Sequence, residues 1–211
     1  FLYSPSIDNN QVNIRYQDFD ADDFLVQTVN RFDDEKETES TVEGSLNWTK
    51  QFPDNKDHKW TADFRYTSEY EREQSVITQD TTGRSGQLIQ DVDNTEDQSS
   101  YLIQTDYVKP IKEDVSFETG SRLTLRTIRN DYGLSDVDEN GQLVPVQAFT
   151  NKFLFRENVY AAYAIYNGKF SEKFTYQTGL RAEFTDITTE LDSGTANQRD
   201  YFNLFPSAFL T

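Results

Sequence analysis

The sequence predicts an all-β protein that consists of a meander of long antiparallel strands. Its clearest sign is "FTYQTGLRAEFTDITTE", residues 174–190, where apolar and polar side chains alternate. Successive side chains of a strand point to opposite faces, so rings and aliphatic groups collect on one face and polar groups on the other. A strand in a soluble sheet usually runs about 5 to 6 residues. A stretch as long as this one therefore favours an unusually tall sheet.

Composition removes several classes of protein. Only 35% of the 211 residues are hydrophobic, and no run approaches the roughly 20 apolar residues of a membrane-spanning helix. A barrel in a membrane remains open, because its strands are apolar only at every second position. The chain is also 14% aromatic, which is unlike a disordered acidic chain.

Charge and residue usage narrow the function further. The formal net charge is -17, with 37 acidic and 20 basic residues, and such a chain repels nucleic acid phosphates. There is no Cys and one His, so thiolate metal sites and Cys or His nucleophiles have almost nothing to work with. No pair of carboxylates stands out as an acid and a base. We therefore expect no catalytic, cofactor-binding or metal-binding residues, and not an enzyme.

Alternation recurs along the chain and predicts three hairpins followed by a seventh strand. Short turns join the strands of each hairpin, and long polar loops, such as residues 79–97 and 131–151, join one hairpin to the next. Short turns at one end and long loops at the other are typical of an outer-membrane barrel. The predicted strands are residues 41–52, 59–78, 98–110, 115–130, 156–170, 174–190 and 201–211.

Aromatic residues flank the predicted short turns. They are Phe52, Trp60, Tyr107, Phe170 and Phe174. Rings at strand ends match the aromatic girdle of a membrane interface. The alternative is a set of aromatic cross-strand pairs in a soluble sheet.

The two ends of the chain are harder to interpret. Residues 22–32, "DDFLVQTVNRF", fit a short helix about as well as a strand. We expect residues 1–37 to form an extracellular loop that can carry a hairpin, and residues 38–211 to form contiguous barrel strands. Neither a signal peptide nor a Met begins the chain, and "YFNLFPSAFLT" stops within a strand. We expect a piece of a longer protein.

Charged residues lie well inside the predicted strands, on the face opposite the rings. Charges of both signs in such positions suggest a wet or ion-paired interior, such as a barrel lumen, although a solvent-facing sheet would also carry them. The candidate lumen-facing residues are Arg65, Glu118, Arg122, Arg126, Arg181 and Glu183.

Two short motifs have a simpler interpretation than their formal match. "DVDENG", residues 136–141, resembles the first half of a calcium-binding loop, but Gln147 stands where that motif needs a bidentate Glu. An Asn-Gly turn is the better interpretation. "NWT", residues 47–49, is a glycosylation sequon inside a predicted strand, where we expect it to be accidental.

The order of several motifs resembles a known family. An "E-x-x-x-A-x-Y" strand, a "GLR-x-E" strand and an "FPS" element follow one another at Glu157, Gly179 and Phe205. This series is similar to the barrel of TonB-dependent outer-membrane receptors, and in particular to the subfamily of outer membrane β-barrel proteins. The likeness spans roughly residues 38–211.

The resemblance implies a function in uptake. Such a receptor takes up a scarce ligand, such as a siderophore, cofactor or oligosaccharide, across the outer membrane of a Gram-negative bacterium, energised through TonB. Its partners would be outer-membrane lipid, that ligand and, through parts of the protein absent from this chain, the TonB complex. The plug domain and the C-terminal strands of that family are not present here. Two alternatives remain: a soluble or surface-exposed β-sandwich that binds glycan or protein, and a small non-transporting barrel or adhesin.

Overall fold

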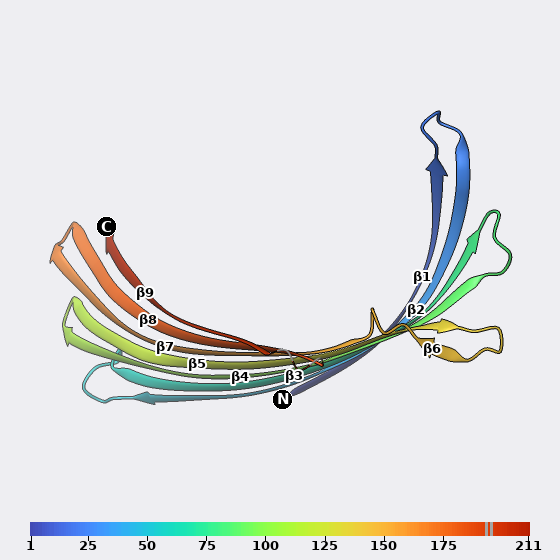
Figure 1. Ribbon diagram of the computed structural model, residues 1–211. Coiled ribbons are helices and arrows are strands. Elements are labelled where there is room, and N and C mark those ends of the chain that lie inside the picture. Colours follow the sequence, from blue (N-terminus) through green and yellow to red (C-terminus); the bar gives the residue numbers. More distant parts are fainter. Residues whose placement is uncertain (193, 195) are drawn as a thin grey trace.

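The computed structural model is a single antiparallel sheet of very long strands (Figure 1). It describes residues 1–192, 194 and 196–211, so residues 193 and 195 of the loop predicted before the last strand lie outside the described part. Within that part, no helix is long and apolar enough to cross a membrane. The strands are β1 Leu2–Phe19, β2 Leu25–Gln51, β3 Lys59–Thr81, β4 Leu88–Lys112, β5 Val115–Val137, β6 Leu143–Pro145, β7 Asn151–Ser171, β8 Phe174–Leu191 and β9 Ala196–Leu210.

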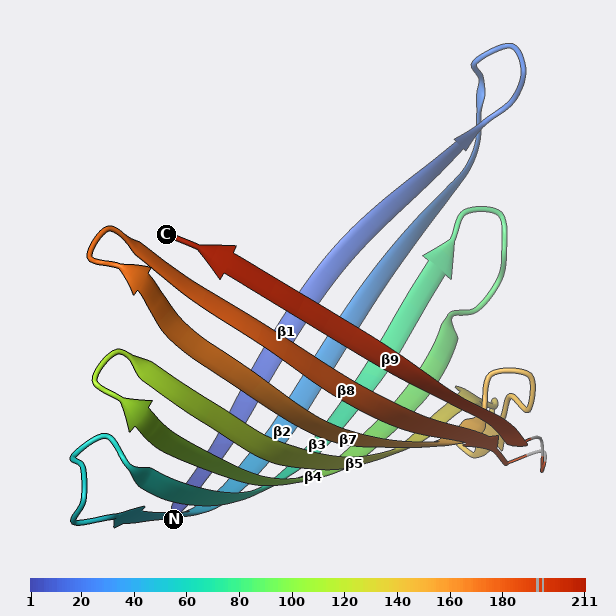
Figure 2. The same ribbon diagram turned by 90° about the vertical axis from the view of Figure 1, so that its left-hand side faces the viewer.

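Strands that follow one another in the sequence are neighbours in the sheet. The order is β1-β2-β3-β4-β5-β7-β8-β9, and the short β6 pairs with β5. The sheet bends and twists into an open gutter, in which β1 and β9 form the two free edges (Figure 2). No second sheet packs on it within the described residues. A β-sandwich needs two packed sheets, so the soluble sandwich alternative is wrong.

The strand register sorts side chains onto two faces. Directly opposite residues share a face, and one continuous row across β3, β4, β5, β7, β8 and β9 contains only aliphatic and aromatic side chains. We call the face with this row the ring-bearing face and the opposite one the polar face. The row contains Phe64, Ile103, Leu123, Tyr160, Phe184 and Phe202.

The ring-bearing face exposes the larger side chains. Leu46 is 73% exposed, Leu180 50% and Ile103 48%. On the polar face, by contrast, Ala161 and Thr185 are buried. Side chains converge on a concave surface and spread on a convex one, so the polar face is the inner face of the gutter. Exposed rings on the outside and polar groups within are the inverse of a soluble protein and match a barrel wall in lipid.

The sequence identified seven of the strands by alternation, and these correspond to β2, β3, β4, β5, β7, β8 and β9. β1 lies in the region where a hairpin was considered, and it pairs with the first part of β2, whereas β6 was not predicted. Most strands run further than predicted, because the polar stretches taken for loops continue the ladder. Residues 22–24 form a turn and residues 25–32 lie in β2, so the helix considered there is wrong. The first 37 residues form β1, its turn and the first part of β2.

Candidate functional site

The six charged residues singled out from the sequence share the polar face. Arg122 and Glu183 lie in one row, since both are opposite Ala161 of β7. Four of the six take part in ion pairs on this face. Arg181 Nη2 lies 2.9 Å from Glu183, which is also one of the six. Arg65 Nε lies 3.6 Å from Glu43, and Arg126 Nε lies 3.7 Å from Glu157. The sequence did not single out the partners Glu43 and Glu157.

A tyrosine bridge across three strands occupies the middle of this polar face. Tyr163 of β7 crosses β5 above Gly120, and its hydroxyl donates to the carboxylate of Asp106 on β4. Asp106 also accepts a hydrogen bond from Gln104, at 2.8 Å. A Cβ on Gly120 would lie 2.6 Å from the carbonyl oxygen of Thr105 and 2.8 Å from the Tyr163 ring. Glycine is therefore required for the bridge to form.

Aromatic rings gather at the short-turn end of the sheet. Trp48 and Trp60 meet edge to face at 5.5 Å, and Phe170 lies 4.3 Å from Tyr176. Such contacts favour ordered rings at the strand ends. Rings with an apolar body and a polar tip suit the boundary between lipid and water.

The only histidine closes the turn between β2 and β3. The His58 ring stacks on Phe52 at 4.0 Å, its Nδ1 is 2.7 Å from Asp54, and its Nε2 is 2.8 Å from the Tyr107 hydroxyl. The hydrogen bond from His58 holds the pKa of Asp54 below its ordinary value, with help from backbone amides. All polar atoms of the ring are satisfied, so this cluster fixes the turn against β4.

At the opposite end, the polar face becomes a wall of carboxylates. Glu39, Glu71 and Glu96 lie directly opposite one another on β2, β3 and β4, and Glu37 lies opposite Glu73. Desolvation raises the pKa of Glu71, and the charges of its acidic neighbours raise it further. Like charges directly opposite one another destabilise a sheet. The backbone hydrogen bonds between the strands therefore have to offset the repulsion between these carboxylates.

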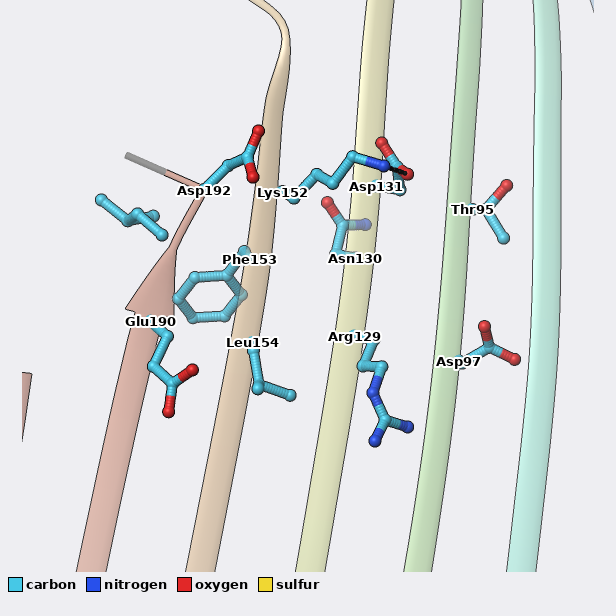
Figure 3. Close-up of a pocket in the computed structure, with 11 residues that line it drawn as sticks. Thr95, Asp97, Arg129, Asn130, Asp131, Lys152, Phe153, Leu154, Glu190 and Asp192 are labelled. Carbon is cyan, nitrogen blue, oxygen red and sulfur yellow. Dashed lines mark hydrogen bonds and ion pairs between the residues drawn. The ribbon is translucent and has the colours of Figure 1, made fainter. Parts of the chain in front are cut away.

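A groove of about 520 Å³ lies on the ring-bearing face at the same end, across β4, β5, β7 and β8 (Figure 3). Lys152 and Asp131 point toward one another within it and form an ion pair of 2.6 Å. Arg156 beside it is paired with Glu190 at 3.1 Å. Arg129, Asp97 and Asp192 also carry charge here, so acidic groups outnumber basic ones. Several of the charged side chains in and beside the groove are therefore already paired with one another.

The motif at residues 136–141 ends β5 with its first two residues and forms a turn with the rest. The Asp138 carboxylate accepts hydrogen bonds from the backbone amides of Asn140 and Gln142, at 2.9 and 2.7 Å. These bonds lower the pKa of Asp138. Gly141 has a φ of 78°, a conformation that glycine adopts without strain. The turn interpretation is confirmed.

Two-faced strands of this length define the wall of a membrane-spanning barrel. The model of the Outer membrane protein beta-barrel family matches residues 50–211. The chain belongs to this family, and its place is the outer membrane of a Gram-negative bacterium.

One solved structure supports the fold. The chain resembles the ferric citrate transporter FecA in its unliganded form, with 15% identity and a TM-score of 0.55 over 99% of this chain and 34% of that one. It also resembles BauA, the ferric preacinetobactin receptor of Acinetobacter baumannii, with 10% identity and a TM-score of 0.48 over 99% of this chain and 37% of that one. Comparison with curated proteins gives no match. The chain thus spans about a third of the length of these two structures.

Proposed function

We propose that this chain forms part of the barrel wall of a TonB-dependent receptor that takes up a scarce ligand. The observation that carries the proposal is the polar face: Arg122, Arg126 and Arg181 lie inside strands whose opposite face is apolar. Charges at bilayer depth are costly unless they face a water-filled or protein-filled interior. A barrel lumen provides that environment, and a transported ligand needs a water-filled route of this kind. The likeness to FecA extends to the fold alone and agrees with this assignment.

The free edges of the sheet also support a larger barrel. β1 and β9 each pair with one strand, and unpaired backbone groups are not tolerated in lipid. We infer that further strands of the full protein cover both edges and close the barrel. A plug and a TonB-contacting segment would belong to that protein as well.

Energy-dependent uptake tests the proposal. Cells that produce the full-length protein would be given labelled ferric siderophores, cobalamin and oligosaccharides, with and without an uncoupler of the proton gradient. We expect accumulation of one of these probes that stops with the uncoupler. Uncoupler-insensitive accumulation, or none of any class, would contradict active uptake.

Substitutions on the polar face test whether this face lines the route of the ligand through the barrel. Arg122→Gln, Arg126→Gln and Arg181→Gln should each lower uptake, whereas Arg156→Gln, on the ring-bearing face, should leave it unchanged. Unchanged uptake in all three polar-face variants would remove these arginines from the lumen assignment. Amounts of folded protein in the outer membrane, compared for all four variants, separate a transport defect from failed assembly.

A further inference from the structure

A second groove lies on the ring-bearing face near the far ends of β1, β2 and β3, with a volume of about 370 Å³. We propose that it binds an uncharged oligosaccharide on the outside of the barrel. This site is separate from any route through the lumen. The side chains that line it from this face are Asn13, Arg15, Asn30, Phe32, Thr78 and Asp80, joined by Gln87 from the turn after β3.

Register places the ring of Phe32 between polar neighbours. Phe32 lies opposite Asn13 on β1 and Thr78 on β3. The next row on the same face is Asn30, opposite Arg15 and Asp80. An aromatic ring presents a flat apolar surface, and amides present donors and acceptors in one plane. A sugar ring has an apolar C–H face and a rim of hydroxyls, which this pairing of surfaces fits.

Hydrogen-bonding capacity in the groove is largely unused. Among the described residues, only Asp80 and Gln87 of the lining side chains bond to each other, at 3.0 Å. The side chains of Asn13, Arg15, Asn30 and Thr78 make no hydrogen bond or ion pair within that part of the chain. The groove of Figure 3 differs, because its Lys152 is already paired with Asp131. Free donors and acceptors around a ring are what a polyhydroxy ligand requires.

Charge selects among sugars. The side chains that line the groove from this face carry one cation, Arg15, and one carboxylate, Asp80, so they have no net charge. Arg31, which also borders the groove, belongs to the polar face and is paired with Asp33 at 3.1 Å. The chain as a whole carries -17, and a field of that sign lowers the local concentration of anions. Sugar phosphates and uronic acids are therefore disfavoured. An uncharged oligosaccharide is the matching class.

Position determines which oligosaccharides can reach the groove. The apolar band of β3 ends near Tyr70, and Thr78 lies roughly 26 Å further along the strand. In barrels of this kind the short turns lie in the periplasm, so the groove faces the exterior above the lipid. Two sources can supply the ligand there: sugar chains of glycolipids in the same membrane, and free oligosaccharides outside the cell.

Binding to glycan arrays tests the site with full-length protein in detergent. One arm offers neutral oligosaccharides together with their phosphorylated and uronic acid counterparts. The other offers lipid-free oligosaccharide released from the producing cell's own glycolipid. We expect binding to at least one neutral sugar, weakened by about tenfold or more in Phe32→Ala and in Asn30→Ala. The arm that gives the signal identifies the source.

Matched variants distinguish loss of sugar binding in the groove from effects on folding and on transport. Phe170→Ala removes a ring at the other end of the sheet, and Gln74→Ala removes an exposed amide elsewhere on the ring-bearing face of β3; both should bind like the parent protein. Absence of neutral-sugar binding in both arms, binding of acidic sugars alone, or affinity unchanged by Phe32→Ala and Asn30→Ala would each overturn the proposal. Phe32→Ala should leave energy-dependent uptake intact, so failure of this site and failure of the transport assignment are distinguishable.

Discussion

The half of the sheet near the short turns and the half near the β1–β2 tip follow different rules. Near the turns, most residues alternate, and rows such as Phe64–Ile103–Leu123 face one way while Gln104 and Arg122 face the other. Toward the tip, polar residues occupy both faces and the inner face carries opposed glutamates. The same strands pass through both halves. Lipid therefore dictates the residue pattern in one half, whereas in the other half the backbone ladder is supplemented by ion pairs such as Lys152–Asp131.

Charge placed on the ring-bearing face should have the largest effect. Ile103→Lys puts a cation in the apolar row, where lysine near the midplane of a barrel costs about 2–4 kcal/mol. Gln104→Lys, one residue further and on the polar face, should fold nearly as well as the parent protein. Unfolding of the full-length protein from lipid vesicles by urea measures the difference. Equal stability of the two variants would show that the faces are assigned incorrectly.

Removal of the glycine beneath the tyrosine bridge should have the next largest effect. The methyl group of Gly120→Ala meets the Thr105 carbonyl and the Tyr163 ring, and overpacking of this kind costs about 1–3 kcal/mol. Gly44→Ala is the matched control, because no atom lies within 4 Å of the Cβ it would add. The same urea titration compares them. A Gly120→Ala protein as stable as Gly44→Ala would mean that the bridge does not form.

Neutralisation of one glutamate in the far half should have the smallest effect and the opposite sign. Glu71 has a pKa raised above the ordinary 4.5 by burial and by Glu37, Glu96, Glu39 and Glu73. Its ionised form therefore destabilises this half at neutral pH. As the pH falls through the raised value the penalty disappears, and it is fully absent below 4.5. Glu71→Gln should stabilise the far half at pH 7 by roughly 0.2–1 kcal/mol.

Hydrogen exchange of the β2, β3 and β4 amides, corrected for intrinsic rates, measures this effect at pH 7 and at pH 5. The parent protein should gain protection at the lower pH, and Glu71→Gln should gain less. Glu139→Gln, in the loop after β5, is the control and should behave like the parent protein. An identical pH response in Glu71→Gln would show that the opposed glutamates do not control the stability of this half.

The sequence by itself determined the half of the molecule that contacts lipid. Alternation from Trp60 to Tyr66, and again from Phe174 to Phe184, follows from the need to place apolar groups outward and polar groups inward, so it can be read without coordinates. It also placed all six charged candidates, Arg181 and Glu183 among them, on one face, because parity along a strand fixes the face.

Only the tertiary structure decided the rest. β1 and the far ends of β3 and β4 show no apolar alternation in the sequence. These segments form strands because neighbouring strands supply hydrogen-bond partners. The contact of Tyr163 with Asp106 and the groove around Phe32 likewise join residues that are distant in sequence. Their proximity depends on strand register, which is a property of pairs of strands and is not contained in the pattern of any single one.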